Sequence, residues 1–225
     1  MKRIIIIIML CVATCFGTNA QNVNIVNDLN IAPEEVEAVR QRIVDKVNEL
    51  QDNIQRMAGI GTMSHKGKED VKSITLKLFL GEGEEYRERI PSPWGFKDTI
   101  HEGVKMGVIN SKYRKVRRYL PMPNYFNGLI RNSEAQNYRY KKIVIESADG
   151  VRVDNFSKVG DGRYVATAHI LQHFAGYGGD GRLMYHDYTA KTITIYINRI
   201  EEESPEGLVT HWIILLGDVD CDDIW

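Results

Sequence analysis

The stretch RYVATAHILQHF, residues 163–174, decides the fold. Its residues fall into two alternating sets, a period of two that predicts a β-strand with one face against a core. The set predicted to face the core is Ala166, Ala168, Ile170 and Phe174. The opposite set is Val165, Thr167, His169, Leu171 and His173. The strand therefore has one packed face and one more polar face.

Further strand-like runs lie on both sides of this stretch, and turn residues separate them. The runs are expected near residues 140–147, 151–159, 189–200 and 208–220. The turns are expected at residues 149–150, 160–162, 178–181 and 204–207, which are rich in Gly, Asp, Ser and Pro. Parallel neighbours need a crossover of a dozen or more residues, so connections this short predict an antiparallel meander.

The first half of the chain reads as helical. Apolar residues from Pro33 to Ala58 recur every three or four positions, which lines one face of a long helix. Pro33 suits its first position, and Gly59 suits its end. A second helix is expected from Lys68 to Leu80, a strand around residues 104–108, a loop over residues 91–96, and a short helix from Pro123. The pattern predicts an α+β fold, with N-terminal helices packed on a long-stranded, curved antiparallel sheet.

Three segments carry a resemblance to a known family. They are the long first helix, the strand entry DGRYVATA at residues 161–168 and the closing strand WIILLGDV at residues 212–219. In this order they resemble the nuclear transport factor 2-like family, the cone-shaped fold of ketosteroid isomerases and polyketide cyclases, and pieces of small exported bacterial proteins of unassigned role. The resemblance implies a ligand space between the concave sheet face and the helices. It transfers no catalytic residue, because no position matches the family's carboxylate base and its donors. A cystatin-like sheet around a helix is the nearest alternative.

The N-terminus predicts export. A basic start, a short apolar run from Ile4 to Phe16 and the small-residue site before Gln21 are typical of a signal peptide. The apolar run is too short to span a bilayer, so no transmembrane segment is expected. We divide the chain into a signal peptide (1–20), an extension (21–32) and one domain (33–225), in a periplasmic or secreted protein. Retention of Cys15 as a lipid anchor is the alternative.

Composition narrows the classes of function. The chain has 43% hydrophobic and 26% charged residues and a formal net charge of −1, so it is an ordinary globular protein without the basic surplus of a nucleic-acid binder. We expect no nucleic-acid partner. No cofactor fingerprint or metal motif is present, and we expect neither a cofactor nor a metal.

The more polar sheet face supplies candidate binding residues. If the strands align, His169, His173, Thr194 and Tyr196 form a surface for a partner, a ligand or a second copy of the chain. The alternative is an outer sheet face that contacts only solvent. The two histidines cannot share a metal, because four residues of strand span about 13 Å.

Two further groups are candidates. A basic cluster could bind phosphate, an acidic glycan or an anionic lipid head group, or could simply be a solvated charged face. It consists of Lys112, Arg114, Lys115, Arg117 and Arg118. Trp94 and Trp212 could contact a small-molecule or glycan ligand or line an interface, or could simply pack into their own domain.

The leading hypothesis is an exported, non-catalytic binding or interaction module of the bacterial envelope, with a homodimer through the sheet face and a small-molecule or glycan ligand as candidate partners. The alternative is a small-molecule enzyme of the ketosteroid isomerase-like or cyclase-like type. An apolar hollow of several hundred cubic ångströms with a buried carboxylate or histidine would favour the enzyme. An interior filled by Phe79, Phe126 or Trp212 would favour the binding module.

Overall fold

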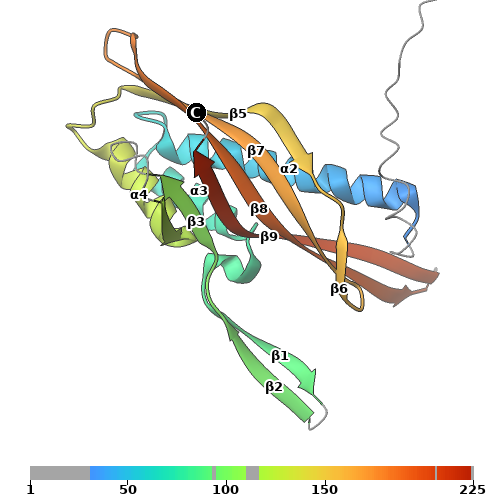
Figure 1. The fold of residues 1–225 in the computed structure, drawn as a ribbon. Helices are drawn as coiled ribbons and strands as arrows, with labels where there is room; N and C mark the ends of the chain where they lie inside the picture. Colours follow the sequence, from blue (N-terminus) through green and yellow to red (C-terminus); the bar gives the residue numbers. More distant parts are fainter. Residues whose placement is uncertain (1–30, 93–94, 110–116, 206, 224–225) are drawn as a thin grey trace, which may run out of the picture.

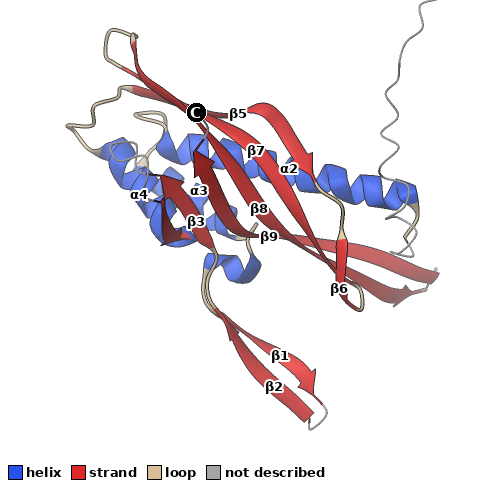
Figure 2. Cartoon of the chain, viewed as in Figure 1, coloured by secondary structure: helices blue, strands red, loops and turns tan. Residues whose placement is uncertain are grey.

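The computed structural model describes residues 31–92, 95–109, 117–205 and 207–223. These residues form the expected α+β fold, in which the helices cover one face of a curved seven-stranded sheet and leave the other face without helices (Figures 1 and 2). No helix in this part of the chain is both long enough and apolar enough to cross a membrane.

The longest helix, α2, runs from Pro33 to Ala58, as the apolar spacing predicts. Pro33 is in its first turn, and the acidic Glu34 and Glu35 lie at the positive end of the helix dipole. The apolar stripe is buried against the sheet and the other helices. Its buried members are Val36, Val39, Ile43, Val47, Leu50, Ile54, Met57 and Ala58.

The two shorter helices pack beside α2 (Figure 1). Helix α3 spans His65–Leu76 and begins three residues before the predicted start, because the Ser64 hydroxyl accepts a hydrogen bond from the Gly67 N–H at 3.2 Å and caps it. It also ends before the predicted Leu80, where a 3-10 turn, η1, covers Leu80–Gly83. Helix α4 spans Met122–Glu134 with a proline in its first turn, as expected.

The main sheet has the order β4-β3-β9-β8-β7-β5, with the short β6 paired to β7. Strands β7, β8 and β9 form the predicted antiparallel meander. The strand predicted around residues 104–108 is β3, but its partner was not predicted: β3 lies parallel to β9 through the pair Met106 and Val219. The strand bounds are β3 Lys105–Ile109, β4 Arg117–Pro121, β5 Lys142–Val153, β6 Ser157–Gly160, β7 Arg163–Tyr177, β8 Leu183–Ser204 and β9 Gly207–Asp223.

Two local expectations were wrong. Asp149 and Gly150 do not form a turn between two strands: β5 continues through them as a bulge opposite β7, with Gly150 at φ 76°. Residues 91–96 are not simply a loop. Instead β1 (Tyr86–Ser92) and β2 (Gly95–His101) form a hairpin that projects from the main sheet (Figure 1).

Polar side chains of α2 fix this helix on the sheet. Gln55 lies against the edge strand β5, donating to the carbonyl of Ile143 at 2.9 Å and accepting from the N–H of Ile145 at 2.5 Å. Glu35 accepts a hydrogen bond from the Trp212 indole of β9 at 2.7 Å. The helix is therefore held in register with two strands as well as by its apolar stripe.

The apolar contact between α2 and the rest of the core should dominate stability. Ile54→Ala removes a side chain that is fully buried in α2, so we expect the free energy of unfolding in urea to fall by about 2–5 kcal/mol. Ile74→Ala in α3 is the matched control, because Ile74 is 56% exposed, and its effect should stay within about 0.5 kcal/mol. Equal losses in the two variants would contradict the placement of the core.

Candidate functional site

The predicted sheet-face residues lie on the same helix-free surface. In the register of β7 and β8, His169 pairs with Thr192, while Thr194 and Tyr196 follow on the same face of β8. His169 Nε2 lies 2.8 Å from an oxygen of Asp154. The sheet therefore brings these candidates together on one face, which remains the predicted docking or dimerisation surface.

His173 occupies a separate place on that face. Its Nδ1 lies 3.1 Å from Glu146 on β5, and its ring stacks on Tyr188 with 4.6 Å between centroids. Each of the two histidines thus has its own carboxylate partner. The described part of the chain contains no group of three His, Cys, Asp or Glu side chains placed to hold a metal.

The basic cluster is described only in part. Lys112, Arg114 and Lys115 lie outside the described residues, as does Trp94. Arg117 forms ion pairs with Asp220 and Asp222 of β9. Its charge is therefore already engaged by carboxylates.

The remaining two candidates, Arg118 and Trp212, lie on different strands and differ in exposure. Arg118 is exposed on the edge strand β4, opposite Val108. Trp212 is on the core side of β9, where its indole binds Glu35 and its ring lies 5.9 Å from that of Tyr164. The tryptophan therefore packs into its own domain, apart from the histidine face.

The interior is mostly filled. Phe79 and Phe126 are almost completely buried, and their ring centroids lie 6.2 Å apart. A hollow of about 280 Å³ remains beside them, between the helix-covered face of the sheet, α4 and the loop that follows α4. It is lined by Gly107, Val108, Ile109, Tyr125, Tyr138, Tyr140, Gln172, Phe174, Tyr185, Asp187, Thr189 and Lys191.

Aromatic rings form much of the wall of this hollow. Tyr138 meets Tyr140 edge-on at 5.6 Å between centroids, Tyr140 meets Phe174 at 5.8 Å, and Phe174 meets Tyr185 at 6.0 Å. The ring of Tyr140 fits because Gly176 has no side chain: a Cβ there would lie 2.5 Å from the ring. This aromatic wall therefore requires a glycine at position 176.

Polar groups converge on the same space. The Tyr185 hydroxyl donates to Asp187 at 2.6 Å, and Gln172 donates to Gln51 of α2 at 2.6 Å. Thr189 and Lys191 follow Asp187 on the same face of β8. The lining of the hollow therefore combines aromatic rings with several polar groups, and small-molecule sites are concave surfaces in which a few placed polar groups fix the ligand.

Lys191 is the most unusual residue of the hollow. It is only 5% exposed, and its Nζ lies 3.4 Å from the Met106 sulfur and 5.8 Å from the centroid of the Tyr125 ring. Burial lowers the pKa of Lys191 to about 8, while the neighbouring Cys221 acts in the opposite direction. Among the described residues no carboxylate lies within ion-pair distance of this ammonium group.

Lys68 shows how the same fold accommodates a structural lysine. It is 1% exposed, and its Nζ donates to the Gly59 carbonyl at 2.7 Å and to the Ser133 hydroxyl at 2.6 Å. Burial lowers its pKa, and Glu134 partly opposes this. Lys68 therefore joins α3 to α2 and α4, whereas Lys191 has only a weak sulfur acceptor.

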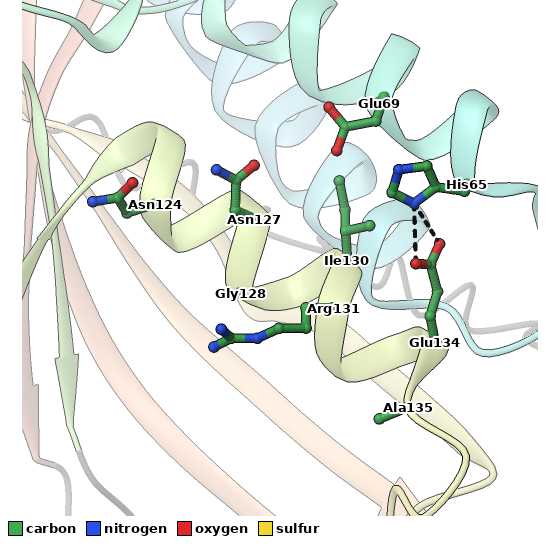
Figure 3. A pocket seen from close by; sticks show the side chains of 9 residues that line it. All are labelled: His65, Glu69, Asn124, Asn127, Gly128, Ile130, Arg131, Glu134 and Ala135. Carbon is green, nitrogen blue, oxygen red and sulfur yellow. Dashed lines mark hydrogen bonds and ion pairs between the residues drawn. The ribbon is translucent and has the colours of Figure 1, made fainter.

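A wider groove between α3 and α4 is a weaker candidate. Its volume is about 810 Å³, and Figure 3 shows His65 and Glu134 in contact with each other among the residues that line it. The His65 Nδ1 lies 3.0 Å from the Glu134 carboxylate, but the two side chains are 68% and 36% exposed. An exposed pair of this kind contributes little energy and fixes no ligand.

No family model and no curated protein matches the chain.

Sequence reasoning missed Lys191 and the aromatic wall, although one signal was available for the lysine. Lys191 has the same strand parity as Ile193, Ile195 and Ile197, all fully buried, so a charged residue stands on the core face of β8. The aromatic wall had no such signal, because its members come from the loop after α4, β7 and β8.

The two buried lysines should respond oppositely to replacement by Met. Lys68→Met leaves the Gly59 carbonyl without its partner, so the free energy of unfolding should fall by about 1–3 kcal/mol. Lys191→Met replaces an unneutralised buried charge by an apolar chain of similar length, so this free energy should rise by about 1–3 kcal/mol at pH 7. Urea denaturation measures both changes.

The pH dependence of the free energy of unfolding shows whether the effect of Lys191→Met comes from the lost charge or from changed packing. The pKa of Lys191 is about 8 in the folded protein and 10.5 as a model value, so between these values the unfolded chain binds more protons. Wild-type stability should therefore gain from raising the pH through 8, and the advantage of Lys191→Met should shrink from pH 7 to pH 9. An advantage that is constant with pH, or absent at pH 7, would contradict the assignment.

Proposed function

We propose that the protein is an exported, non-catalytic binding module that takes a small organic molecule into the hollow beside Lys191. One observation carries the proposal: an almost completely buried lysine lines a hollow of about 280 Å³, and five of the other residues that line this hollow are aromatic. Protein sites for small molecules share this combination of apolar walls and a few convergent polar groups.

The way in which the core is packed supports ligand binding in the hollow beside Lys191. Phe79 and Phe126 fill the core next to α4, which was the arrangement expected of a binding module. The hollow next to them is smaller than the 300–1,000 Å³ typical of drug-sized ligands, so its occupant is a small molecule with at most a compact ring system.

The proposed fold family agrees with this location. In the nuclear transport factor 2-like family, which the element order resembles, ligands occupy the space between the concave sheet face and the helices. The hollow lies between the helix-covered face of the sheet and α4. We therefore propose a member of that family whose hollow contains a buried lysine.

Filling the hollow should abolish binding. Thr189→Trp places a large ring in the cavity from β8, whereas Thr192→Trp places the same ring on the helix-free face of the same strand. The probes are benzoate, phenylacetate, indole-3-acetate and their amides. Their binding is measured by saturation-transfer NMR and by the shift in the thermal unfolding temperature. At least one probe should bind wild type and Thr192→Trp, and Thr189→Trp should bind it at least about tenfold more weakly.

Three outcomes of this experiment are informative. Failure of every probe to bind wild type contradicts the proposed function. Equal binding by Thr189→Trp, with the variant shown to be folded by circular dichroism, contradicts the assignment of the hollow. Conversion of a probe into new species during the measurement would replace the binding module by the isomerase-like or cyclase-like alternative.

Export is tested separately. The signal peptide lies outside the described residues, so the test is processing in a bacterial host. We expect the mature protein to begin at Gln21 and to be found in the soluble envelope or culture fraction, and Cys15→Ala should change neither result. Membrane retention that is lost in Cys15→Ala would show lipid anchoring instead, and cytoplasmic full-length chain would contradict export.

A further inference from the structure

The charge of Lys191 is left without a counter-charge in the described structure. An ammonium group has three donors, and the acceptor recorded for this one is the thioether of Met106 at 3.4 Å. A thioether is a weak acceptor, and the face of the Tyr125 ring at 5.8 Å is the other favourable contact. Neither replaces the water that the ammonium loses on burial.

The groups packed around Lys191 do not remove this deficit. Cys221 is its register partner on β9, and burial raises the pKa of this thiol, so it remains neutral at pH 7. Burial also raises the pKa of Tyr125 on α4, which remains a neutral phenol. Gln172 on β7 is uncharged and bonded to Gln51.

Asp187 is the carboxylate of the hollow, but it lies away from Lys191. The two residues are four positions apart on one strand, which separates their backbones by about 13 Å. Asp187 accepts hydrogen bonds from the Tyr185 hydroxyl at 2.6 Å and from the N–H of Tyr188 at 2.9 Å. Asp187 therefore does not neutralise Lys191.

We propose that Lys191 binds the carboxylate of a small organic acid whose flat apolar body lies against the tyrosines of the hollow. This inference rests on the proposed function and adds the chemical class of the ligand. The carboxylate supplies the counter-charge that the described residues lack, and a charge-assisted hydrogen bond in a buried site is among the strongest that a protein makes.

The position of Lys191 orients the acid in the hollow. A carboxylate placed next to the Lys191 ammonium group is attracted to it. The rings of Tyr138, Tyr140, Phe174 and Tyr185 then receive the apolar body through edge and face contacts.

Matched acids and amides test the charge without changing the shape. Benzoate, phenylacetate and indole-3-acetate are compared with benzamide, phenylacetamide and indole-3-acetamide by calorimetry and ligand-observed NMR. Wild type should prefer the acid of a binding pair by about 10-fold or more, the range for a hydrogen bond to a charged group. Lys191→Met should lose this preference while still binding the amide.

A surface lysine provides the control. Lys142→Met removes an exposed cation from β5, so it tests whether general attraction of anions explains the preference. This variant should retain the wild-type ratio of acid to amide. Lys191→Arg tests geometry, because the larger planar guanidinium should fit the site poorly and weaken acid binding.

The pH provides a second readout. Affinity for the acid should fall about fourfold between pH 7 and pH 8.5 as Lys191 loses its proton, because its pKa is about 8 in the free protein. Cys221, Tyr125, Tyr138 and Tyr140 have pKa values raised above their ordinary ones and stay protonated over this interval. The dependence should vanish in Lys191→Met.

The outcomes separate the two proposals. Equal affinity of wild type for acid and amide, or an acid preference that survives in Lys191→Met, would overturn the inference while leaving small-molecule binding in place. Failure of all six compounds to bind would contradict the proposed function itself. Loss of the preference in Lys142→Met as well would show general attraction of anions and would also overturn the inference.

Discussion

Burial of the apolar stripe of α2 constrains the rest of the structure. The stripe needs an apolar surface, and the alternating strands offer one on a single face of the sheet. Once the helix covers that face, every second residue of β7 and β8 points toward the helical layer. The same parity that buries Ala168 and Ile195 also buries Gln172 and Lys191.

The lengths of the elements explain why a hollow remains at one end of the core. Helix α2 has 26 residues and is about 39 Å long, whereas β8 has 22 residues and extends over about 73 Å. One helix cannot cover such a strand. Near Lys191 the cover comes from α4 and the loop after it, and the residues lining the hollow include none from α2. Tyrosine rings there enclose space where a continuous helix would have filled it.

Local sequence patterns predicted the helices and strands, but they did not predict the contacts between segments that are far apart along the chain. The three-and-four spacing of apolar residues gave α2 its bounds, and the period of two gave β7, β8 and β9, because each pattern is set by the geometry of its own segment. The parallel pairing of β3 with β9 joins residues more than a hundred positions apart. No local spacing encodes that contact, and the hollow depends on it because β3 supplies one wall.

The same difference between local and long-range signals applies to the residues of the candidate site. The helix-free face with His169 and Tyr196 followed from strand parity alone. Gly150 was misread because a glycine with positive φ serves a bulge as well as a turn, and only the partner strand decides between them. The sequence alone could not show that Trp212 and Arg117 are already engaged within the domain. Trp212 binds Glu35, and Arg117 binds Asp220 and Asp222. These partners lie more than a hundred positions away along the chain, so only the folded structure reveals them.

Lys68 and Lys191 differ in how the fold accommodates a buried charge, and the difference supports our proposal that Lys191 binds a ligand. Lys68 gives two of its donors to strong oxygen acceptors on α4 and at the end of α2, so its burial is offset by hydrogen bonds that hold three helices together. Lys191 gains a thioether and an aromatic face, which are soft groups that tolerate a cation without using up its donors. For packing alone a methionine would serve at that position at lower free energy. On our proposal the further acceptor is a ligand, and a carboxylate is the acceptor that best matches the charge of the ammonium group.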